Sequence, residues 1–137
     1  MKVYNRYNKK LIGEFDISQN ADLRWVDLQM ANLKGANLQG VNLHGVNLRW
    51  ANLQSANLEN ADLRWANLIG VNLTSANLTG ANLKEADLLW ADLQMANLKD
   101  ANLQGVNLRG TNLRLVCFHN TNFHDAIIFP DWKITKL

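Results

Sequence analysis

Apolar and polar residues follow a five-residue pattern that runs without a break from Ala21 to Asp125. Each unit begins with Ala, Val or Thr, continues with Asn or Asp, and places Leu or Phe third, so that 105 residues form 21 units. The one exception at the second position is Cys117, and Phe replaces Leu only at Phe118 and Phe123. The last two positions vary freely. The chain is therefore a tandem array, and each residue is interpreted through its place in the unit.

The pattern predicts a short extended segment followed by a turn. A period of five fits neither strict strand alternation nor a helical face alone. On extended backbone, the first and third side chains of a unit point to one side and the intervening Asn or Asp points to the other. Asn, Asp, Gly and Ser supply the turn chemistry. One unit cannot bury its own Leu, but coils stacked about 4.8 Å apart can form a continuous Leu core.

These units, for example residues 31–35 (ANLKG) and 56–60 (ANLEN), resemble the A(D/N)LXX units of pentapeptide repeat proteins, over about three quarters of the chain. The resemblance implies an all-β fold, a right-handed quadrilateral β-helix with four pentapeptides per coil. It also implies that the first and third positions lie inside and the other three outside. On that geometry residue n lies beneath residue n+20, and the array makes slightly more than five coils.

The ends of the chain depart from the pattern and divide it into an N-terminal cap (1–20), the solenoid (21–125) and a C-terminal cap (126–137). Such caps are expected because an open coil exposes unpaired strand edges and bare Leu. The segments 10–14 and 15–19 are interpreted as degenerate units.

Two further features are predicted in the N-terminal cap. Ile12 and Ile17 would occupy the large apolar position of the degenerate units, and Asn20, as an extra residue, predicts a bulge where the array begins. A four-residue spacing of apolar residues predicts a short helix over the first coil. The residues with that spacing are Val3, Tyr7 and Leu11.

The C-terminal cap begins where the Asn of the unit is lost, and Pro130 within it cannot donate to another ladder. Its apolar residues could cover the last coil or pair with the same end of a second molecule. They are Phe129, Trp132, Ile134 and Leu137. We therefore expect a monomer or a homodimer joined through a terminal cap.

Composition and charge narrow the partner class. The 137 residues suit one domain whose core is the column of Leu and Phe. The 14 basic and 12 acidic residues are mixed and give a net charge of +2, which favours solubility and no strong partner class. No apolar run has the length of a signal peptide or a membrane span, and the lone Cys117 excludes an internal disulfide. We expect a cytoplasmic protein without a membrane partner.

The repeated Asn residues indicate a structural pattern, not a catalytic or metal site. Fifteen Asn and five Asp share the second position, whereas calcium-binding repeats need clustered carboxylates with Gly at fixed offsets. His44, His119 and His124 fall at an outward variable position, where a solvated side chain is the default. No nucleophile has a base and an orienting partner within the repeat, and there is no glycine-rich phosphate loop. We expect no enzyme activity, cofactor or metal.

Tryptophan is the more unusual surface feature, because four of the five Trp residues occupy the outward fifth position of a unit. On n+20 stacking, one corner reads Trp25, Gly45, Trp65, and Gly45 should leave a notch between two indoles. The neighbouring corner repeats this with Trp50, Gly70 and Trp90.

That second corner predicts a contiguous patch, here named the apolar strip, formed by Met30, Trp50, Ile69, Leu89 and Trp90. Such patches commonly mark partner surfaces, so the apolar strip is the candidate protein-binding site.

The Trp residues are also accounted for without any partner. Residues 22–45 and 87–110 match at 20 of 24 positions, so an internal duplication could have copied Trp25 to Trp90. Packing of each Trp side chain over its neighbouring coil would also be a sufficient reason for Trp to be kept at these positions. Duplication, packing and partner binding therefore all stay open.

We expect a non-catalytic solenoid that acts as a protein-binding or scaffold module. Most pentapeptide repeat proteins, which are abundant in cyanobacteria, have no assigned biochemical function, so the resemblance implies a fold more than a task. Some protect DNA gyrase by resembling duplex DNA in size and negative charge, which makes topoisomerase modulation the alternative. Mimicry of that kind needs a strongly acidic rod, whereas this chain carries a net charge of +2.

Two further partner classes are disfavoured. A nucleic-acid groove would use the most basic line of the rod, but acidic residues at Asp22, Asp62 and Glu85 dilute it. That line consists of Arg24, His44, Arg64 and Lys84. An ice- or mineral-binding face needs a flat, regular array, and only Thr74 and Thr79 approach one.

Overall fold

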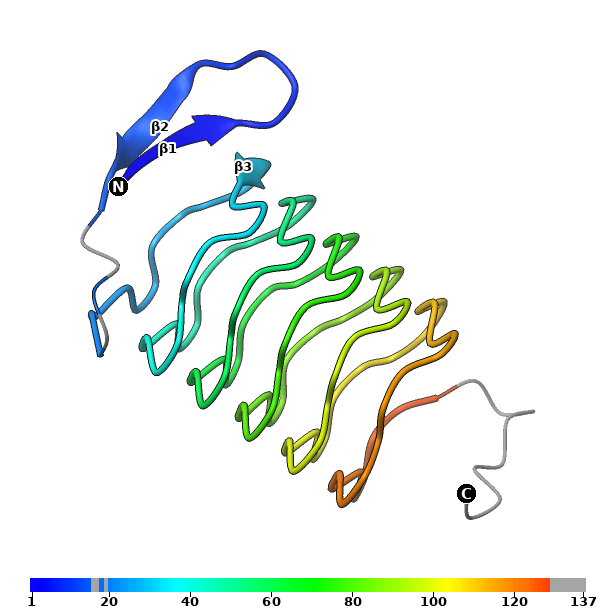
Figure 1. The fold of residues 1–137 in the computed structure, drawn as a ribbon. Helices are drawn as coiled ribbons and strands as arrows, with labels where there is room; N and C mark the ends of the chain where they lie inside the picture. The colour runs from blue at the N-terminus through cyan, green and yellow to red at the C-terminus, as the bar shows by residue number, and fades with distance from the viewer. Residues whose placement is uncertain (16–17, 19, 129–137) are drawn as a thin grey trace.

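A computed structural model shows a rod of stacked coils with a β-hairpin at its N-terminal end (Figure 1). The structure describes residues 1–15, 18 and 20–128. Its strands are β1 (Lys2–Asn5), β2 (Leu11–Glu14) and β3 (Ala31–Asn32). In the coils, isolated bridges between single residues take the place of longer strands, because each extended segment is only a few residues long.

The coils stack in a register of 20 residues. Parallel bridges join the second position of each unit to the residue 20 positions later, from Asp22 with Asn42 to Asn107 with Ile127. Backbone hydrogen bonds accompany each bridge; for example, the Leu63 N–H donates to the carbonyl of Asn82 at 2.7 Å. The predicted β-helix is confirmed, and 20 residues correspond to four units per coil. Its right-handed sense stays a prediction.

The first and third positions of the units form the core. In the central coils the Leu side chains expose 0% of their surface and the Ala and Val side chains at most 2%. Among the described residues, no polar or charged residue is buried. This follows from the sequence pattern, because two apolar side chains two residues apart on extended backbone face the same way. The core is one apolar column along the rod.

The fifth position of every unit has a left-handed backbone. From Trp25 to Asp125 its φ lies between 56° and 67°, although 14 of the 21 positions hold residues other than Gly. This conformation costs a residue with a Cβ about 1–2 kcal/mol. The N–H of the same residue bonds to the next coil, as from Trp50 to the carbonyl of Ile69 at 2.9 Å. The register of the coils therefore imposes the turn, whichever residue occupies it.

The second-position side chains bond within and between coils. The Oδ1 of Asn57 accepts hydrogen bonds from the Glu59 N–H at 3.2 Å and from Nδ2 of Asn77 at 3.3 Å. The Nδ2 of Asn57 donates to Oδ1 of Asn37 at 3.1 Å. The same oxygen thus closes its own turn and accepts a bond from the next coil. The Asn rows stabilise the turns and connect the coils.

Replacing Asn57 by Ala should lower the free energy of unfolding by about 1–3 kcal/mol, because it removes three hydrogen bonds. Glu59→Ala, which removes none of them, should change it by less than about 0.5 kcal/mol. Asn57→Asp keeps the accepting oxygen and loses only the donor to Asn37, so its stability should fall between the two. Urea denaturation followed by circular dichroism measures all three, and equal midpoints for the two Ala variants would contradict a structural role of the row.

The N-terminal cap is a hairpin, and the predicted helix is wrong. β1 pairs antiparallel with both β2 and β3, which gives the sheet order β2-β1-β3. Val3 is buried at 1% exposure, whereas Tyr7 and Leu11 expose 64% and 47%. The side chain of Asn5 accepts hydrogen bonds from the backbone N–H of Tyr7 and of Asn8, at 2.9 and 3.2 Å. These bonds favour a turn after β1 over a helix through it.

The hairpin is fastened to the first two coils through Arg6. The Arg6 N–H donates to the carbonyl of Met30 at 2.7 Å. The guanidinium of Arg6 donates to the carbonyl oxygens of Trp50 and Ala51 at 3.1 and 3.3 Å. The hairpin thus lies beside the corner that carries Met30 and Trp50.

The degenerate unit predicted at residues 10–14 is wrong, and most of the one predicted at residues 15–19 lies outside the described residues. Residues 11–14 form β2, although Ile12 still packs partly against the core. The N–H of Ala21 donates to the carbonyl of Ser18 at 2.9 Å, as first positions do to third positions within the array, and Asn20 has a φ of 65°. Asn20 therefore ends a unit and is not an extra residue, so the predicted bulge is wrong. Ile17 lies outside the described residues.

At the other end, the coil continues three residues beyond the predicted boundary. Ile127 bridges to Asn107, and the N–H of Ala126 donates to the carbonyl of Phe123 at 3.0 Å. The ladder persists because it uses backbone groups, which do not require Asn at the second position. The predicted cap residues Phe129, Pro130, Trp132, Ile134 and Leu137 lie outside the described part of the chain.

Candidate functional site

The outward Trp side chains lie over glycines of the next coil. A methyl group added at Gly45, Gly70 or Gly110 would overlap ring atoms of the Trp that stands 20 residues earlier. Each indole therefore covers the glycine of the next coil. The notches predicted between indoles are wrong as open spaces, because the indole side chains fill them.

The five residues of the apolar strip follow one corner through successive coils. Backbone hydrogen bonds join them along the rod, with Trp50 donating to Ile69 and Gly70 donating to Leu89, each at 2.9 Å. Trp90 exposes 61% of its surface, and the other four members are partly exposed. The structure therefore brings the candidate residues together in a continuous line, with Gly70 covered between the two indoles.

The second candidate corner, with Trp25, Gly45 and Trp65, is less regular. Trp25 and Trp65 expose 67% and 59%, and the Trp25 ring contacts the His44 ring edge-on at 5.1 Å between centroids. One coil beyond Trp65 stands Glu85, where the neighbouring corner has glycine. This corner therefore presents two separate indoles among polar side chains.

Two cations at the ends of the apolar strip were missed in the sequence. Arg49 and Arg109 occupy the fourth-position column that also holds Ile69 and Leu89, one coil before and one coil after that apolar pair. Within the described part of the chain, neither guanidinium has a carboxylate partner. The signal was present in the 20-residue spacing of positively charged and apolar residues along one column.

A pair of exposed apolar residues on a third corner was also missed. Met95 and Leu115 expose 56% and 75% of their surface and stand 20 residues apart. Both are large side chains at fifth positions, where the same turn directs them outward.

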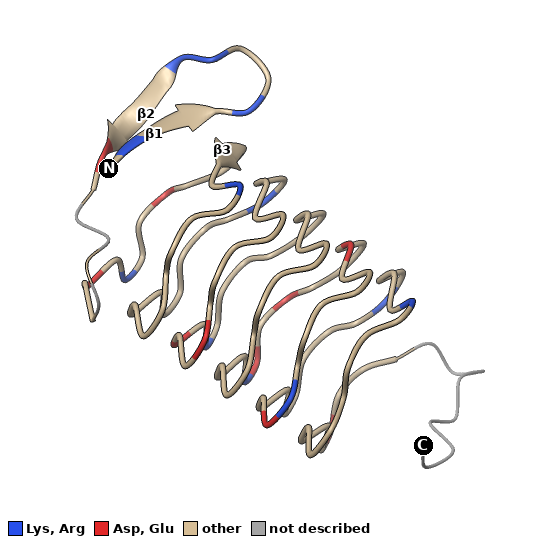
Figure 2. Ribbon diagram, in the orientation of Figure 1, with Lys and Arg blue, Asp and Glu red and all other residues tan. Residues whose placement is uncertain are grey.

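The most basic line of the rod is neutralised locally. Arg64 forms a 2.6 Å ion pair with Asp62, and Arg24 forms one of 2.7 Å with Asp22. The hydrogen bonds from each guanidinium lower the pKa of the Asp carboxyl below its usual value and raise the pKa of the Arg. Positive and negative groups are interspersed over the coils (Figure 2). Both arginines of the line are thus paired with carboxylates, so the line is not a continuous positive groove.

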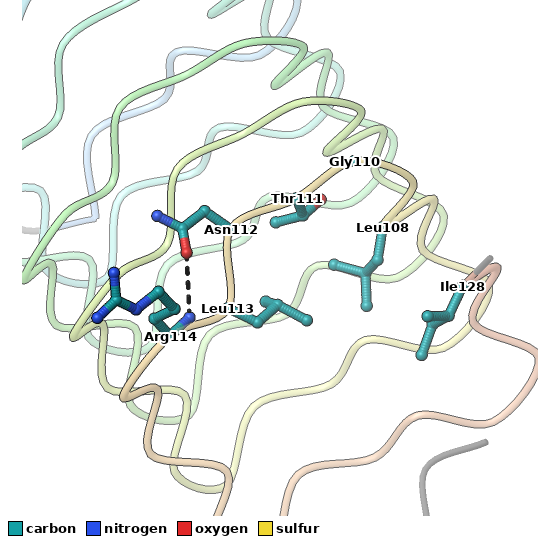
Figure 3. Close-up of a pocket in the computed structure, with 7 residues that line it drawn as sticks. All are labelled: Leu108, Gly110, Thr111, Asn112, Leu113, Arg114 and Ile128. Carbon is teal, nitrogen blue, oxygen red and sulfur yellow. Dashed lines mark hydrogen bonds between the residues drawn. The ribbon is translucent and has the colours of Figure 1, made fainter. Parts of the chain in front are cut away.

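A hollow of about 390 Å³ lies at the C-terminal end of the described coils (Figure 3). Leu108, Leu113 and Ile128, which line it, belong to the inward apolar column, and its one charged residue is Arg114. The hollow lies where the core of the described coils ends, and the residues that line it include no His, Cys, Asp, Glu or Lys.

The described residues provide no group of three His, Cys, Asp or Glu that could hold a metal ion. His44 lies against Trp25, with its Nδ1 buried and without a hydrogen-bond partner, while His119, His124 and Cys117 are exposed. Over the same residues, no helix has the length and apolar character needed to cross a membrane.

Solved structures of two cyanobacterial proteins resemble this one. The pentapeptide repeat protein Rfr23 of Cyanothece 51142 is 32% identical, with a TM-score of 0.74 over 80% of this chain and 88% of that one. HetL of Nostoc sp. strain PCC 7120, a pentapeptide repeat protein involved in heterocyst differentiation regulation, is 30% identical, with a TM-score of 0.67. That match covers 85% of this chain but only 62% of HetL.

QnrB1, a plasmid-mediated fluoroquinolone resistance protein, has a TM-score of 0.72 at 17% identity, over 82% of this chain and 64% of that one, which shows a shared fold alone. No curated protein matches the sequence. The family model for pentapeptide repeats matches in 8 copies, over residues 19–54, 56–94 and 91–128. Since these matches cover most of its length, the chain belongs to the pentapeptide repeat family.

Proposed function

We propose that this protein is a non-catalytic, cytoplasmic scaffold that binds a protein partner through the apolar strip. The observation that carries the proposal is a line of partly exposed apolar side chains, including two indoles, that continues through successive coils on one corner of the rod. Trp is enriched among the residues that dominate binding energy at protein interfaces. A regular rod also holds such residues in fixed positions, so little conformational entropy is lost when a partner binds.

The alternative, modulation of a topoisomerase by mimicry of DNA, has less support. The similarity to QnrB1 shows a fold and not an activity. A mimic of duplex DNA needs a strongly negative surface, whereas this chain has a net charge of +2 and its charges are mixed over the rod (Figure 2). A gyrase supercoiling assay with the purified protein distinguishes the two functions, since a strip-binding scaffold should leave supercoiling unchanged.

The proposed function is tested by affinity capture from a lysate with three baits. They are the wild type, a strip variant and a corner variant with Trp25→Gln and Trp65→Gln. The strip variant carries Trp50→Gln, Ile69→Gln, Leu89→Gln and Trp90→Gln. Circular dichroism first establishes that all three fold. We expect one protein to be retained by the wild type and the corner variant and to be lost from the strip variant.

Identical captures by all three folded baits would contradict the proposal. Loss of capture from the corner variant alone would move the binding site to Trp25 and Trp65. The same preparations, examined by sedimentation, test whether the protein is a monomer or a homodimer joined through a terminal cap.

A further inference from the structure

The backbone spacing of the two Trp residues in the apolar strip selects among peptide conformations. Trp50 and Trp90 stand two coils apart, which is about 9.6 Å at the usual spacing of neighbouring strands. A polyproline II helix has three residues per turn and repeats one face every ~9.3 Å. An extended strand repeats its face every ~6.7 Å and would bring no equivalent side chain to the second indole.

The chemistry of the strip matches that conformation. Both indoles lean over glycines of the next coil, Trp50 with its six-membered ring over Gly70 and Trp90 with its pyrrole edge over Gly110. Neither indole N–H has a hydrogen-bond acceptor among the described residues. A polyproline II backbone makes no internal hydrogen bonds, so its carbonyl oxygens are free to accept from indole N–H groups. Ile69 and Leu89 supply apolar surface beside the indoles.

The positive charges at the two ends of the apolar strip set a second requirement for a bound peptide, which concerns its own charges. Arg49 and Arg109 stand three coils apart, which is about 14.4 Å. Five residues of polyproline II span about 15.5 Å, so carboxylates just outside a Pro-x-x-Pro core would meet the two guanidinium groups. Asp27, one coil before Asn47, accepts hydrogen bonds from the Gln29 N–H and from Nδ2 of Asn47 at 3.1 and 2.9 Å. Asp87, one coil before Asn107, accepts them from the Leu89 N–H and from Nδ2 of Asn107 at 3.0 and 2.9 Å, and neither Asp forms an ion pair with Arg49 or Arg109. Both guanidinium groups therefore stay available to a partner.

We infer that the apolar strip binds a Pro-x-x-Pro segment in the polyproline II conformation, flanked on both sides by Asp or Glu. The segment lies along the rod, with one proline on each indole and one carboxylate at each Arg. The inference rests on the proposed function and names the class of partner at the same site. The corner with Trp25 and Trp65 does not meet these requirements, because its arginines at Arg24 and Arg64 are already paired with carboxylates.

The test uses a fluorescein-labelled peptide, Glu-Pro-Leu-Ala-Pro-Glu, titrated with the full-length protein to about 1 mM and followed by fluorescence polarisation. One control peptide has Lys in place of Glu at both ends. In the second control peptide the two prolines are separated by one residue instead of two. We expect the acidic Pro-x-x-Pro peptide to bind at least tenfold more tightly than either control. Trp90→Gln should weaken binding about tenfold or more, whereas the matched Trp25→Gln should change it less than twofold.

Reversing the charges at both ends of the apolar strip should reverse the peptide preference, a result that loss of folding would not produce. The variant with Arg49→Glu and Arg109→Glu should prefer the Lys-flanked peptide over the acidic one. No binding of the acidic peptide below about 1 mM, or equal binding of all three peptides, would overturn the inference. Strip-dependent binding of a β-1,4-linked glucan oligosaccharide in place of the peptide would overturn it in favour of a carbohydrate.

Failure of this inference is separable from failure of the proposed function. If the strip variant loses a captured protein while no peptide binds, the scaffold function stands and the partner is not a polyproline II segment. If no capture depends on the strip and no peptide binds, both fail.

Discussion

Replacing Leu63 by Ala is expected to lower the free energy of unfolding by about 2–5 kcal/mol. Leu63 exposes 0% of its surface and lies in the middle coils, with Leu43 and Leu83 at the same place in the coils on either side. A cavity at this point is closed by neighbouring coils that are fixed by backbone hydrogen bonds, so it cannot collapse easily. Since a typical domain is stable by about 5–15 kcal/mol, this one change removes a large share of the total.

The matched control is Lys34→Ala, at an exposed fourth position, which should change stability by less than about 0.5 kcal/mol. Thermal and urea denaturation of both variants beside the wild type measure the difference. Comparable losses for Leu63 and Lys34 would mean that the inward column does not carry the stability of the rod.

The Gly70→Ala substitution is expected to lower the free energy of unfolding by about 2–5 kcal/mol, from two costs that add. Gly70 has a φ of 63°, so a Cβ there costs about 1–2 kcal/mol in backbone strain. The added methyl group would also overlap the Trp50 ring, and overpacking of this kind adds about 1–3 kcal/mol unless the indole moves away. A displaced indole would expose more apolar surface at the strip.

Gly35→Ala separates the two contributions. Gly35 has a φ of 66° but no atom within 4 Å of an added Cβ, so this variant should show the backbone cost alone. In a Trp50→Ala background, the cost of Gly70→Ala should fall to that of Gly35→Ala. Equal melting temperatures for Gly35→Ala and Gly70→Ala in the wild-type background would show that the indole does not rest on Gly70.

The repeating part of the fold was predictable because one rule applies to every unit. A small residue and Leu two positions apart determine which side faces the core, and residue 63 obeys the same rule as residue 23 or 103. The 20-residue register came from the family resemblance and is confirmed by the bridges. Position within the unit therefore determined burial in the central coils, whereas several first and third positions of the terminal coils are only partly buried.

The ends were predicted poorly because the rule stops there. The four-residue spacing of Val3, Tyr7 and Leu11 is compatible with a helix, and the competing signal was the turn chemistry of Asn5. Asn20 was counted as an extra residue because the unit before the array lacks Leu, although its backbone follows the repeat.

The candidate site was predicted in its membership but not in its side-chain arrangement. Register alone places Trp50, Ile69 and Trp90 on one corner. It does not show that an indole leans over the glycine of the next coil, since that depends on the rotamer of Trp on a left-handed backbone. Arg49 and Arg109 could be found only by reading each 20-residue column separately, because the net charge of +2 for the chain does not show where single charges lie.

The four-unit register makes stability and surface respond differently to insertions and deletions. Gain or loss of a single five-residue unit preserves every inward Leu, so the core and the ladder can close again. When it falls between Trp50 and Trp90, the same event moves Trp90 to the adjoining corner. A gain or loss of four units there keeps both on one corner but changes their separation by one coil. Over evolutionary time such a rod can change its length readily, while its binding specificity changes abruptly with each step that is not a complete coil.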